Sequence, residues 1–338
     1  FGLATPLGIN STTGVAGLTL GGGFGWLSRS LGHSVDNLIS ADVVTAQGDL
    51  VRASEDERAD LFWGLRGGGG NLGVVTSFTF RLHRVGPEVL AGLIVYPFER
   101  AGDLLKAYRS FVACAPDVLT VWSVLRKAPP LPFLPENVHG KEVVVFPICY
   151  VGEIDEGRRV IEPLRHFGAP VGEHVDPMPF TAWQSAFDPL LSPGARNYWK
   201  SHDFSVVSDA VIDVFVEYAG SLPTPECEVF LAHLDGAAGR VAEDAMAYPS
   251  RNASFVLNVH ARWRDAGQDK ACMSWAREFF AATAPYANGG VYVNFLGADE
   301  QDRVRSAYGG NYERLVALKA KYDPENMFRV NLNVKPAA

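Results

Sequence analysis

Two glycine clusters in the first eighty residues are the features of this sequence best suited to binding chemistry. The first is Gly21-Gly22-Gly23-Phe24-Gly25, and the second joins Gly67–Gly70 to Gly73. Because glycine has no side chain, a ligand can approach the main chain there, and backbone N–H groups can hold it. The clusters therefore favour a site for a long ligand, and glycines that only form bulges and turns are the alternative.

The second cluster also matches a dinucleotide-binding pattern, with glycines at Gly68, Gly70 and Gly73. That pattern must follow a strand and open a helix. Here the glycines follow a predicted helix at 60–65 and precede a β-branched and aromatic run at 74–80, which predicts a strand. A Rossmann site is therefore not predicted, and a phosphate-binding P-loop lacks its Lys-Ser or Lys-Thr.

The elements that must position these clusters change in character at Pro87. About half of the 34 glycines lie before it, in a stretch that predicts short strands joined by tight turns. After Pro87, apolar runs at 142–146 and 229–234 alternate with amphipathic segments, which indicates a second domain. Helices are predicted at about 101–115, 153–167, 209–222, 269–284 and 311–322.

Two further segments alternate so that one face is apolar and the other polar, which predicts strands. In 254–263 the polar side chains Asn258, His260 and Arg262 lie on the face opposite Phe255, Leu257, Val259, Ala261 and Trp263. In 291–296 the polar face carries Tyr292 and Asn294. An antiparallel sheet backed by helices is expected, and its free face is either solvated or roofs a ligand cavity.

Charge and composition exclude several classes of function. The 338 residues carry a formal net charge of -8 with scattered Lys and Arg, so nucleic acid is not an expected partner. No run of about 18 apolar residues is present, so no membrane partner is expected. The spacing of Cys114, Cys149, Cys227 and Cys272 favours buried free thiols and predicts no metal site. A cytoplasmic location is favoured over a secreted one, and no oligomeric state is predicted.

Taken together, the motifs resemble the berberine-bridge-enzyme-like oxidases, which are vanillyl-alcohol-oxidase-type flavoproteins. Residues 14–29, 36–48 and 60–76 are similar to the second half of that family's PCMH-type FAD-binding domain. Tyr292-Val-Asn-Phe295 and Asn331-Leu-Asn-Val334 resemble its C-terminal signature. The resemblance covers essentially the whole chain and implies an α+β fold, in which a partial FAD-binding domain joins a substrate domain. The expected division is 1–86 (FAD-binding domain), 87–303 (substrate domain) and 304–338 (return to the FAD-binding domain).

The resemblance implies FAD as the cofactor and assigns residues to it and to the substrate. The residues expected along FAD are Thr13, Gly14, Gly17, Gly21, Gly22, Gly23, Phe24, Gly25, Gly70, Gly73, Val74, Val75, Asn331 and Asn333. Asn258, His260, Arg262 and Asn294 are expected to bind substrate. Tyr292 is the candidate base, acidified by Arg262 or another nearby cation, and a tyrosine that only forms hydrogen bonds with the substrate or the sheet is the alternative.

The sequence departs from the family pattern in three places. The typical member begins with a further subdomain that carries a histidine bonded covalently to the flavin. This chain is therefore expected to be truncated at its N-terminus, and a missing half supplied by another chain is the alternative. His33 is expected to be a surface or helix-capping residue instead. Asn10 stands where some members have a flavin-linked cysteine, so no cysteinyl link is expected, and Phe24 replaces a catalytic tyrosine of some members.

The reaction implied by the resemblance is an oxidation. A polar organic substrate, such as a sugar or a secondary metabolite, gives hydride to flavin N5 while a base removes a proton, and O2 reoxidises the flavin to yield hydrogen peroxide. The alternative is a truncated, non-catalytic homologue that does not bind flavin productively.

Overall fold

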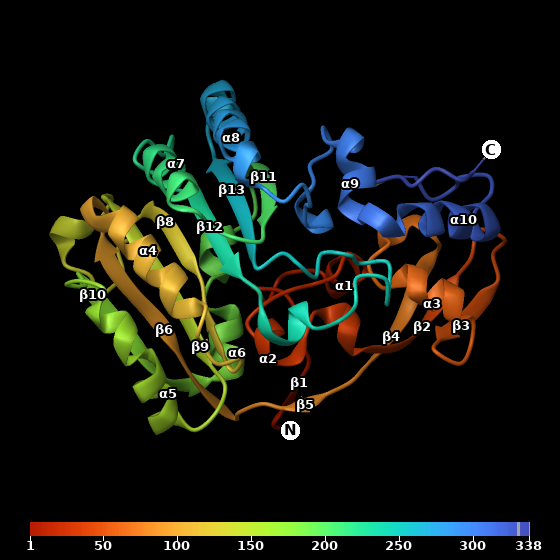
Figure 1. The fold of residues 1–338 in the computed structure, drawn as a ribbon, viewed down its shortest axis with the longest axis horizontal. Coiled ribbons are helices and arrows are strands. Elements are labelled where there is room, and N and C mark those ends of the chain that lie inside the picture. The colour runs from red at the N-terminus through yellow and green to blue at the C-terminus, as the bar shows by residue number, and fades with distance from the viewer. Residues whose placement is uncertain (330–331, 338) are drawn as a thin grey trace.

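An eight-stranded antiparallel sheet forms the larger part of the molecule in this computed structural model, which describes residues 1–329 and 332–337 (Figure 1). Seven strands run in the order β10-β6-β9-β8-β12-β13-β11, and β7 pairs with β9 beside β8. The strands are β6 (Glu88–Pro97), β7 (Leu119–Val121), β8 (Ser123–Lys127), β9 (Glu142–Tyr150), β10 (Gly172–Pro179), β11 (Arg196–Phe204), β12 (Glu228–His233) and β13 (Phe255–Trp263).

Four helices cover one face of this sheet and bury its main core. They are α4 (Ala101–Val112), α5 (Ile154–Ile161), α7 (Asp209–Ala219) and α8 (Asp269–Thr283). The helices predicted in these four places are confirmed, although α4, α5 and α7 end three or more residues earlier than expected and α8 ends one residue earlier. The predicted apolar face of β13 is also confirmed, since all five of its residues lie in that core. The antiparallel sheet backed by helices follows from these two patterns.

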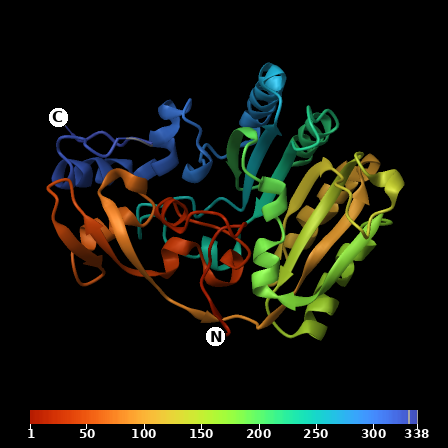
Figure 2. The same ribbon diagram turned by 180° about the vertical axis from the view of Figure 1, so that it is seen from behind.

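The opposite face of the sheet is turned toward a smaller lobe. There α6 (Phe180–Ser185) packs on β6 and β10, and Figure 2 shows this green segment between the sheet and the smaller lobe. Asn258, His260 and Arg262 of β13 point to this side and are nevertheless buried. The polar face of the sheet is therefore covered.

The smaller lobe contains a three-stranded sheet in the order β3-β2-β4. Its elements are β2 (Leu38–Val44), β3 (Leu50–Ser54), α3 (Ala59–Leu65), β4 (Val74–Phe80), α9 (Val304–Tyr308) and α10 (Tyr312–Tyr322). Both views place the blue C-terminal helices in this lobe, although about 250 residues separate α3 from α10 in the sequence (Figures 1 and 2). Short elements complete the chain: β1 (Leu3–Ala4), α1 (Val15–Leu20), α2 (Ser28–Leu31) and β5 (His83–Arg84).

Two segments expected to be strands are not strands. Residues 15–20 form helix α1, in which Leu18 N–H donates to the Gly14 carbonyl at 3.2 Å, so the glycine-rich composition was misleading there. Residues Val293–Phe295 form a single turn of 3-10 helix, closed by Phe295 N–H on the Tyr292 carbonyl at 2.8 Å. The second glycine cluster leads into strand β4, as predicted.

The cysteines are free, and three of the four are buried as predicted. Cys114 is exposed, because it follows the end of α4. No helix within residues 1–329 and 332–337 combines the length and the apolar character that a membrane crossing requires.

A buried ion pair ties the C-terminal tail to the second glycine cluster. The Lys319 ammonium donates to Asp323 Oδ2 at 2.6 Å, to the Asn71 carbonyl at 2.9 Å and to the Phe328 carbonyl at 2.7 Å. Both charged side chains are completely inaccessible to solvent. Asn71 adds its own bonds to the tail, since its Nδ2 donates to the Leu332 carbonyl at 3.0 Å and its Oδ1 accepts from Val334 N–H at 2.9 Å.

Replacing Lys319 with Met should lower the free energy of unfolding by about 3–5 kcal/mol, because Asp323 is then left as an unpaired buried charge. Urea denaturation of the purified protein measures the change. Lys321→Met is the matched control, because Lys321 pairs with Asp60 at 2.6 Å on the surface and its loss should cost less than about 1 kcal/mol. Equal effects of the two variants would show that the buried pair has no special role.

Candidate active site

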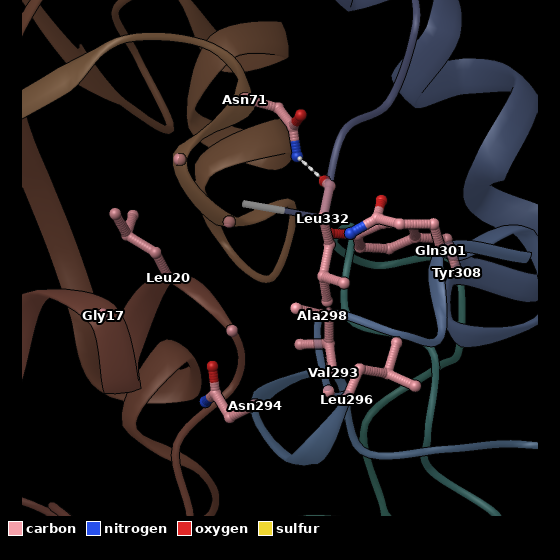
Figure 3. Close-up of a pocket in the computed structure, with 14 residues that line it drawn as sticks. Gly17, Leu20, Asn71, Val293, Asn294, Leu296, Ala298, Gln301, Tyr308 and Leu332 are labelled. Atoms are coloured by element: carbon pink, nitrogen blue, oxygen red, sulfur yellow. Dashed lines mark hydrogen bonds between the residues drawn. The ribbon is translucent and has the colours of Figure 1, made fainter. Parts of the chain in front are cut away.

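The first of two cavities lies where α1, the second glycine cluster and the C-terminal tail meet. We call it the glycine cavity, and its volume is about 390 Å³. Figure 3 shows Gly17 and Leu20 of α1 on one side, with Val293 and Ala298 across from them and Asn71 bonded to Leu332 above. Residues from three distant parts of the chain therefore form its walls.

The wall of the glycine cavity suits a polar ligand held against the main chain. A Cβ added to Gly17 would meet no atom within 4 Å, so this position opens onto free space. The Tyr308 hydroxyl lines the same cavity, is buried and has no hydrogen-bond partner among the described residues. A buried group without a partner is costly, so a bound ligand that pairs with it is favoured. These features fit FAD.

Several glycines assigned to FAD by resemblance have a packing role in the structure. Gly22 and Gly23 have positive φ angles of 110° and 80°, and an added Cβ would collide with Tyr248 and Ser34 respectively. Gly25 lies against the Leu7 carbonyl, and Gly73 (φ 155°) lies against Val43. These four glycines are required by close packing whether or not a ligand binds.

The other residues assigned to FAD lie in several different places. Gly17, Gly21 and Gly70 line the glycine cavity, while Thr13 and Phe24 line the second cavity described below. Gly14 precedes α1, and Val74 and Val75 lie in β4, outside the lining of either cavity. Asn333 is half-buried in the tail, and its Oδ1 is a further buried acceptor with no partner among the described residues. Asn331 lies outside the described residues.

The second and larger cavity lies against the polar face of the large sheet. We call it the aromatic cavity, and its volume is about 1130 Å³. Trp26 and Trp122 stack in its wall with ring centroids 4.1 Å apart, and Phe230 meets Trp122 edge to face at 5.2 Å. The residues expected to handle substrate all line it, namely Asn258, His260, Arg262, Tyr292 and Asn294. The sheet face therefore roofs a cavity, which was one of the two alternatives left open by the sequence.

The two cavities meet at Asn294, which lines both. Its Nδ2 donates to the Leu18 carbonyl at 3.0 Å and to the Tyr292 hydroxyl oxygen at 2.8 Å. The Tyr292 hydroxyl also accepts from Gly23 N–H at 3.1 Å. Two donors, Asn294 Nδ2 and Gly23 N–H, thus hold the Tyr292 hydroxyl beside the residue that lines both cavities.

The expected acidification of Tyr292 by Arg262 is wrong. Arg262 pairs with Glu226 at 3.0 Å and with Asn197 Oδ1 at 2.9 Å. It also lies six residues along β13 from Val256, the strand residue that shares a hydrophobic cluster with Tyr292. Burial raises the pKa of Tyr292 to about 12, the bonds from Asn294 and Gly23 lower it in part, and the nearby charge of Asp203 adds to the rise. The groups that contact the Tyr292 hydroxyl are two neutral hydrogen-bond donors, Asn294 and Gly23, and not the cation that was expected.

His33 is not a surface residue, although its expected capping position is correct. It directly precedes a 3-10 turn at Ser34–Asn37, and its backbone N–H donates to Asp36 Oδ2 at 2.7 Å. Its ring is buried edge to face against Tyr248, with centroids 4.9 Å apart. Burial lowers the pKa of His33 to about 4. Asn10 lines the aromatic cavity, and its Oδ1 has no partner within the described part of the chain.

Sequence reasoning missed a buried acid behind Tyr292. Asp203 lies in β11 opposite Val256 and is 1% exposed, and its main chain bonds to both Asn288 and Gly290, just before Tyr292. Burial raises the pKa of Asp203 to about 7. No strand was predicted at 196–204, so there was no sequence-based reason to expect that this aspartate is buried. Trp122 was missed for the same reason.

No cluster of three or more metal-binding side chains occurs in the described ranges, which is the arrangement a metal centre would need.

The raised pKa of Asp203 predicts a pH-dependent stability. Because the folded state favours its protonated form, stabilisation by this group is complete below pH 3.8 and is lost as the pH rises through about 7. Asp203→Asn should remove that loss and gain up to about 4 kcal/mol over the unaltered protein near neutral pH. Urea denaturation at pH 5 and pH 8 measures the difference.

The matched control for this experiment is Asp155→Asn, whose side chain is 85% exposed and should not alter the pH profile. His33 contributes in the opposite direction, since its stabilisation is lost as the pH falls through about 4, but this contribution is common to all three proteins. If the free energy of unfolding of Asp203→Asn changed with pH in parallel with that of the unaltered protein, the raised pKa assigned to Asp203 would be contradicted.

Comparison with known proteins bears on this pair of cavities. The family model described as "Berberine and berberine like" matches residues 291–335. An FAD-linked oxidoreductase of Dictyostelium discoideum is 32% identical over 99% of this chain and 71% of its own length. BBE-like protein 28 from Arabidopsis thaliana has a similar fold, with a TM-score of 0.87 and 22% identity over 99% of this chain and 74% of its own.

A xylooligosaccharide oxidase from Myceliophthora thermophila, solved with xylobiose, also has a similar fold. Its TM-score is 0.83 with 24% identity, over 100% of this chain and 74% of its own.

Proposed function

This chain belongs to the berberine-bridge-enzyme-like family of FAD-linked oxidoreductases, and from that membership we propose that it is an oxidase of hydroxyl-bearing organic molecules. The proposal includes O2 as the electron acceptor and hydrogen peroxide as its product. It also includes FAD held without a cysteinyl link, because Asn10 stands where that cysteine would be.

The observation that carries the proposal is the meeting of the two cavities at Asn294, whose Nδ2 donates to the Tyr292 hydroxyl in the aromatic cavity. Gly17, Gly21 and Gly70 would hold FAD on the glycine side, with Tyr308 offering a hydroxyl. The aromatic cavity would hold the substrate. The chemistry that FAD supplies when bound is acceptance of hydride from a C–H bond and return of two electrons to oxygen.

Tyr292 would accept the proton of the substrate hydroxyl. Its oxygen already accepts hydrogen bonds from Gly23 N–H and Asn294 Nδ2, and both bonds become stronger when the oxygen is negative. These two donors therefore favour the phenolate against the opposing effect of burial. Asn258 would contact the substrate next to Tyr292, while His260 and Arg262 would contact its far end.

The purified protein with added FAD tests the proposal directly. Retained flavin absorbance, bleaching by substrate without oxygen, and peroxide release in air support an oxidase. A colourless protein that takes up no FAD would overturn it and would favour the non-catalytic homologue.

Gly17→Leu should abolish FAD uptake while leaving the fold intact. The new side chain enters the free space of the glycine cavity and meets no protein atom at its Cβ. Flavin absorbance after gel filtration measures uptake, and circular dichroism checks the fold. Gly102→Leu in α4 is the matched control, because a Cβ there also meets no atom within 4 Å but lies away from both cavities. Normal FAD uptake by Gly17→Leu would remove the glycine cavity from this role.

Tyr292→Phe should slow flavin reduction by about 100-fold or more with little change in FAD content, because the ring remains and only the proton acceptor is lost. Stopped-flow absorbance without oxygen measures the rate, using whichever alcohol the unaltered protein turns over. Tyr286→Phe, an exposed position, is the control. An unchanged rate in Tyr292→Phe would show that another group takes the proton.

A further inference from the structure

The side chains that β13 presents to the aromatic cavity change in character along the strand. Val256 packs with Phe24 and Tyr292 at the inner end, and Asn258, His260 and Arg262 follow at every second position. At about 3.4 Å per residue, His260 lies roughly 14 Å from Val256 along the strand. The cavity therefore has an inner reactive end and a distant polar end.

The walls between these ends are mainly apolar. Trp26, Trp122 and Phe230 form the aromatic part, and Val143 and Val145 of β9 continue the apolar surface along the sheet. The proline-rich loop at 128–135 packs over these valines through Leu134 and closes that side. Few hydrogen-bonding groups face this middle region.

The polar end is a ladder across three neighbouring strands. Glu228 of β12 lies opposite both Arg126 of β8 and His260 of β13. Its carboxylate pairs with Arg126 at 2.9 Å and approaches His260 Nδ1 at 3.6 Å. Burial alone would raise the pKa of Glu228, but Arg126, His260 and Arg262 outweigh it, so this pKa is lowered and the carboxylate stays charged. The ladder is a fixed set of polar groups at the cavity's outer end.

We propose that the substrate is an elongated, largely apolar molecule of two or more rings. Its oxidised hydroxyl lies at Tyr292, its rings lie against the aromatic wall that includes Trp122 and Phe230, and a hydrogen-bonding group at its other end meets the ladder. This inference rests on the proposed function and names the substrate class of the same site.

The middle of the cavity is what disfavours an oligosaccharide. Each sugar ring carries several hydroxyls, and hydroxyls buried against Trp26, Val143 and Val145 would lose their bonds to water without gaining partners. Flat apolar rings instead gain from burial and from edge or stacking contacts with aromatic side chains. A molecule that is polar only at its two ends matches the distribution of groups along the cavity.

Binding can be measured without turnover, by titration calorimetry and by quenching of tryptophan fluorescence. The probes are 4'-(hydroxymethyl)biphenyl-4-ol, biphenyl-4-methanol, which lacks the second hydroxyl, and cellotriose. The biphenyl diol is expected to bind at least 100-fold more tightly than cellotriose. Equal or tighter binding of cellotriose would overturn the inference.

Two variants test the two parts of the cavity. Phe230→Ala should weaken binding of both biphenyls at least 10-fold, whereas Tyr286→Ala, which removes an exposed aromatic ring elsewhere, should not. His260→Ala should remove the advantage of the diol over biphenyl-4-methanol and leave the latter's affinity unchanged. Unchanged binding of the biphenyls to Phe230→Ala, or an unchanged diol preference in His260→Ala, would contradict the proposal.

The outcomes separate this inference from the proposed function. A protein that oxidises cellotriose and rejects the biphenyls contradicts the inference but is still an oxidase. A protein that binds the biphenyl diol but takes up no FAD supports the substrate class and contradicts the proposed function.

Discussion

The carboxamide of Asn294 is the constraint on which the site depends. Its Nδ2 donates one hydrogen bond to the Leu18 carbonyl of α1 and another to the Tyr292 hydroxyl oxygen. The tyrosine is therefore fixed relative to the glycine cavity. This arrangement is possible only because position 21 is glycine, since a Cβ there would lie 2.1 Å from Asn294 Oδ1. A single side chain thus couples the first glycine cluster, the catalytic candidate and both cavities. Any larger residue at position 21 would separate them.

The wall of the glycine cavity that the C-terminal tail forms depends on a second set of buried polar residues. Asn71 and Lys319 bond to the main chain of the C-terminal tail, which brings Leu332 against the second glycine cluster. Because the lysine and its partner Asp323 are both inaccessible to solvent, the pair is costly to break but does little to stabilise the fold compared with apolar residues. We interpret its value as geometric: it fixes where the tail lies, and the tail completes the wall of the cavity.

Sequence patterns predicted the parts of the structure that local periodicity determines. The helices of the larger lobe and the two faces of β13 follow from spacings of three to four and of two residues, which each segment carries in itself. The errors occurred where distant contacts decide. Tyr292–Phe295 forms a turn because Asn294 bonds to α1, nearly 280 residues away, and Arg262 is neutralised by Glu226, which no local pattern relates to it. The burial of His33 likewise depends on Tyr248.

Membership of a family of FAD-linked oxidoreductases constrains the type of reaction more than it constrains the identity of the substrate. The residues that would hold FAD are backbone atoms and small side chains on α1 and the glycine turn, and the fold itself supplies them. The aromatic cavity is built instead from side chains on the sheet face, where each strand can change every second residue without disturbing the core behind it. A similar fold in a xylooligosaccharide oxidase is therefore compatible with a different substrate here. Trp122, Phe230, Val143 and the ladder at Glu228 carry the information about substrate that the shared fold does not.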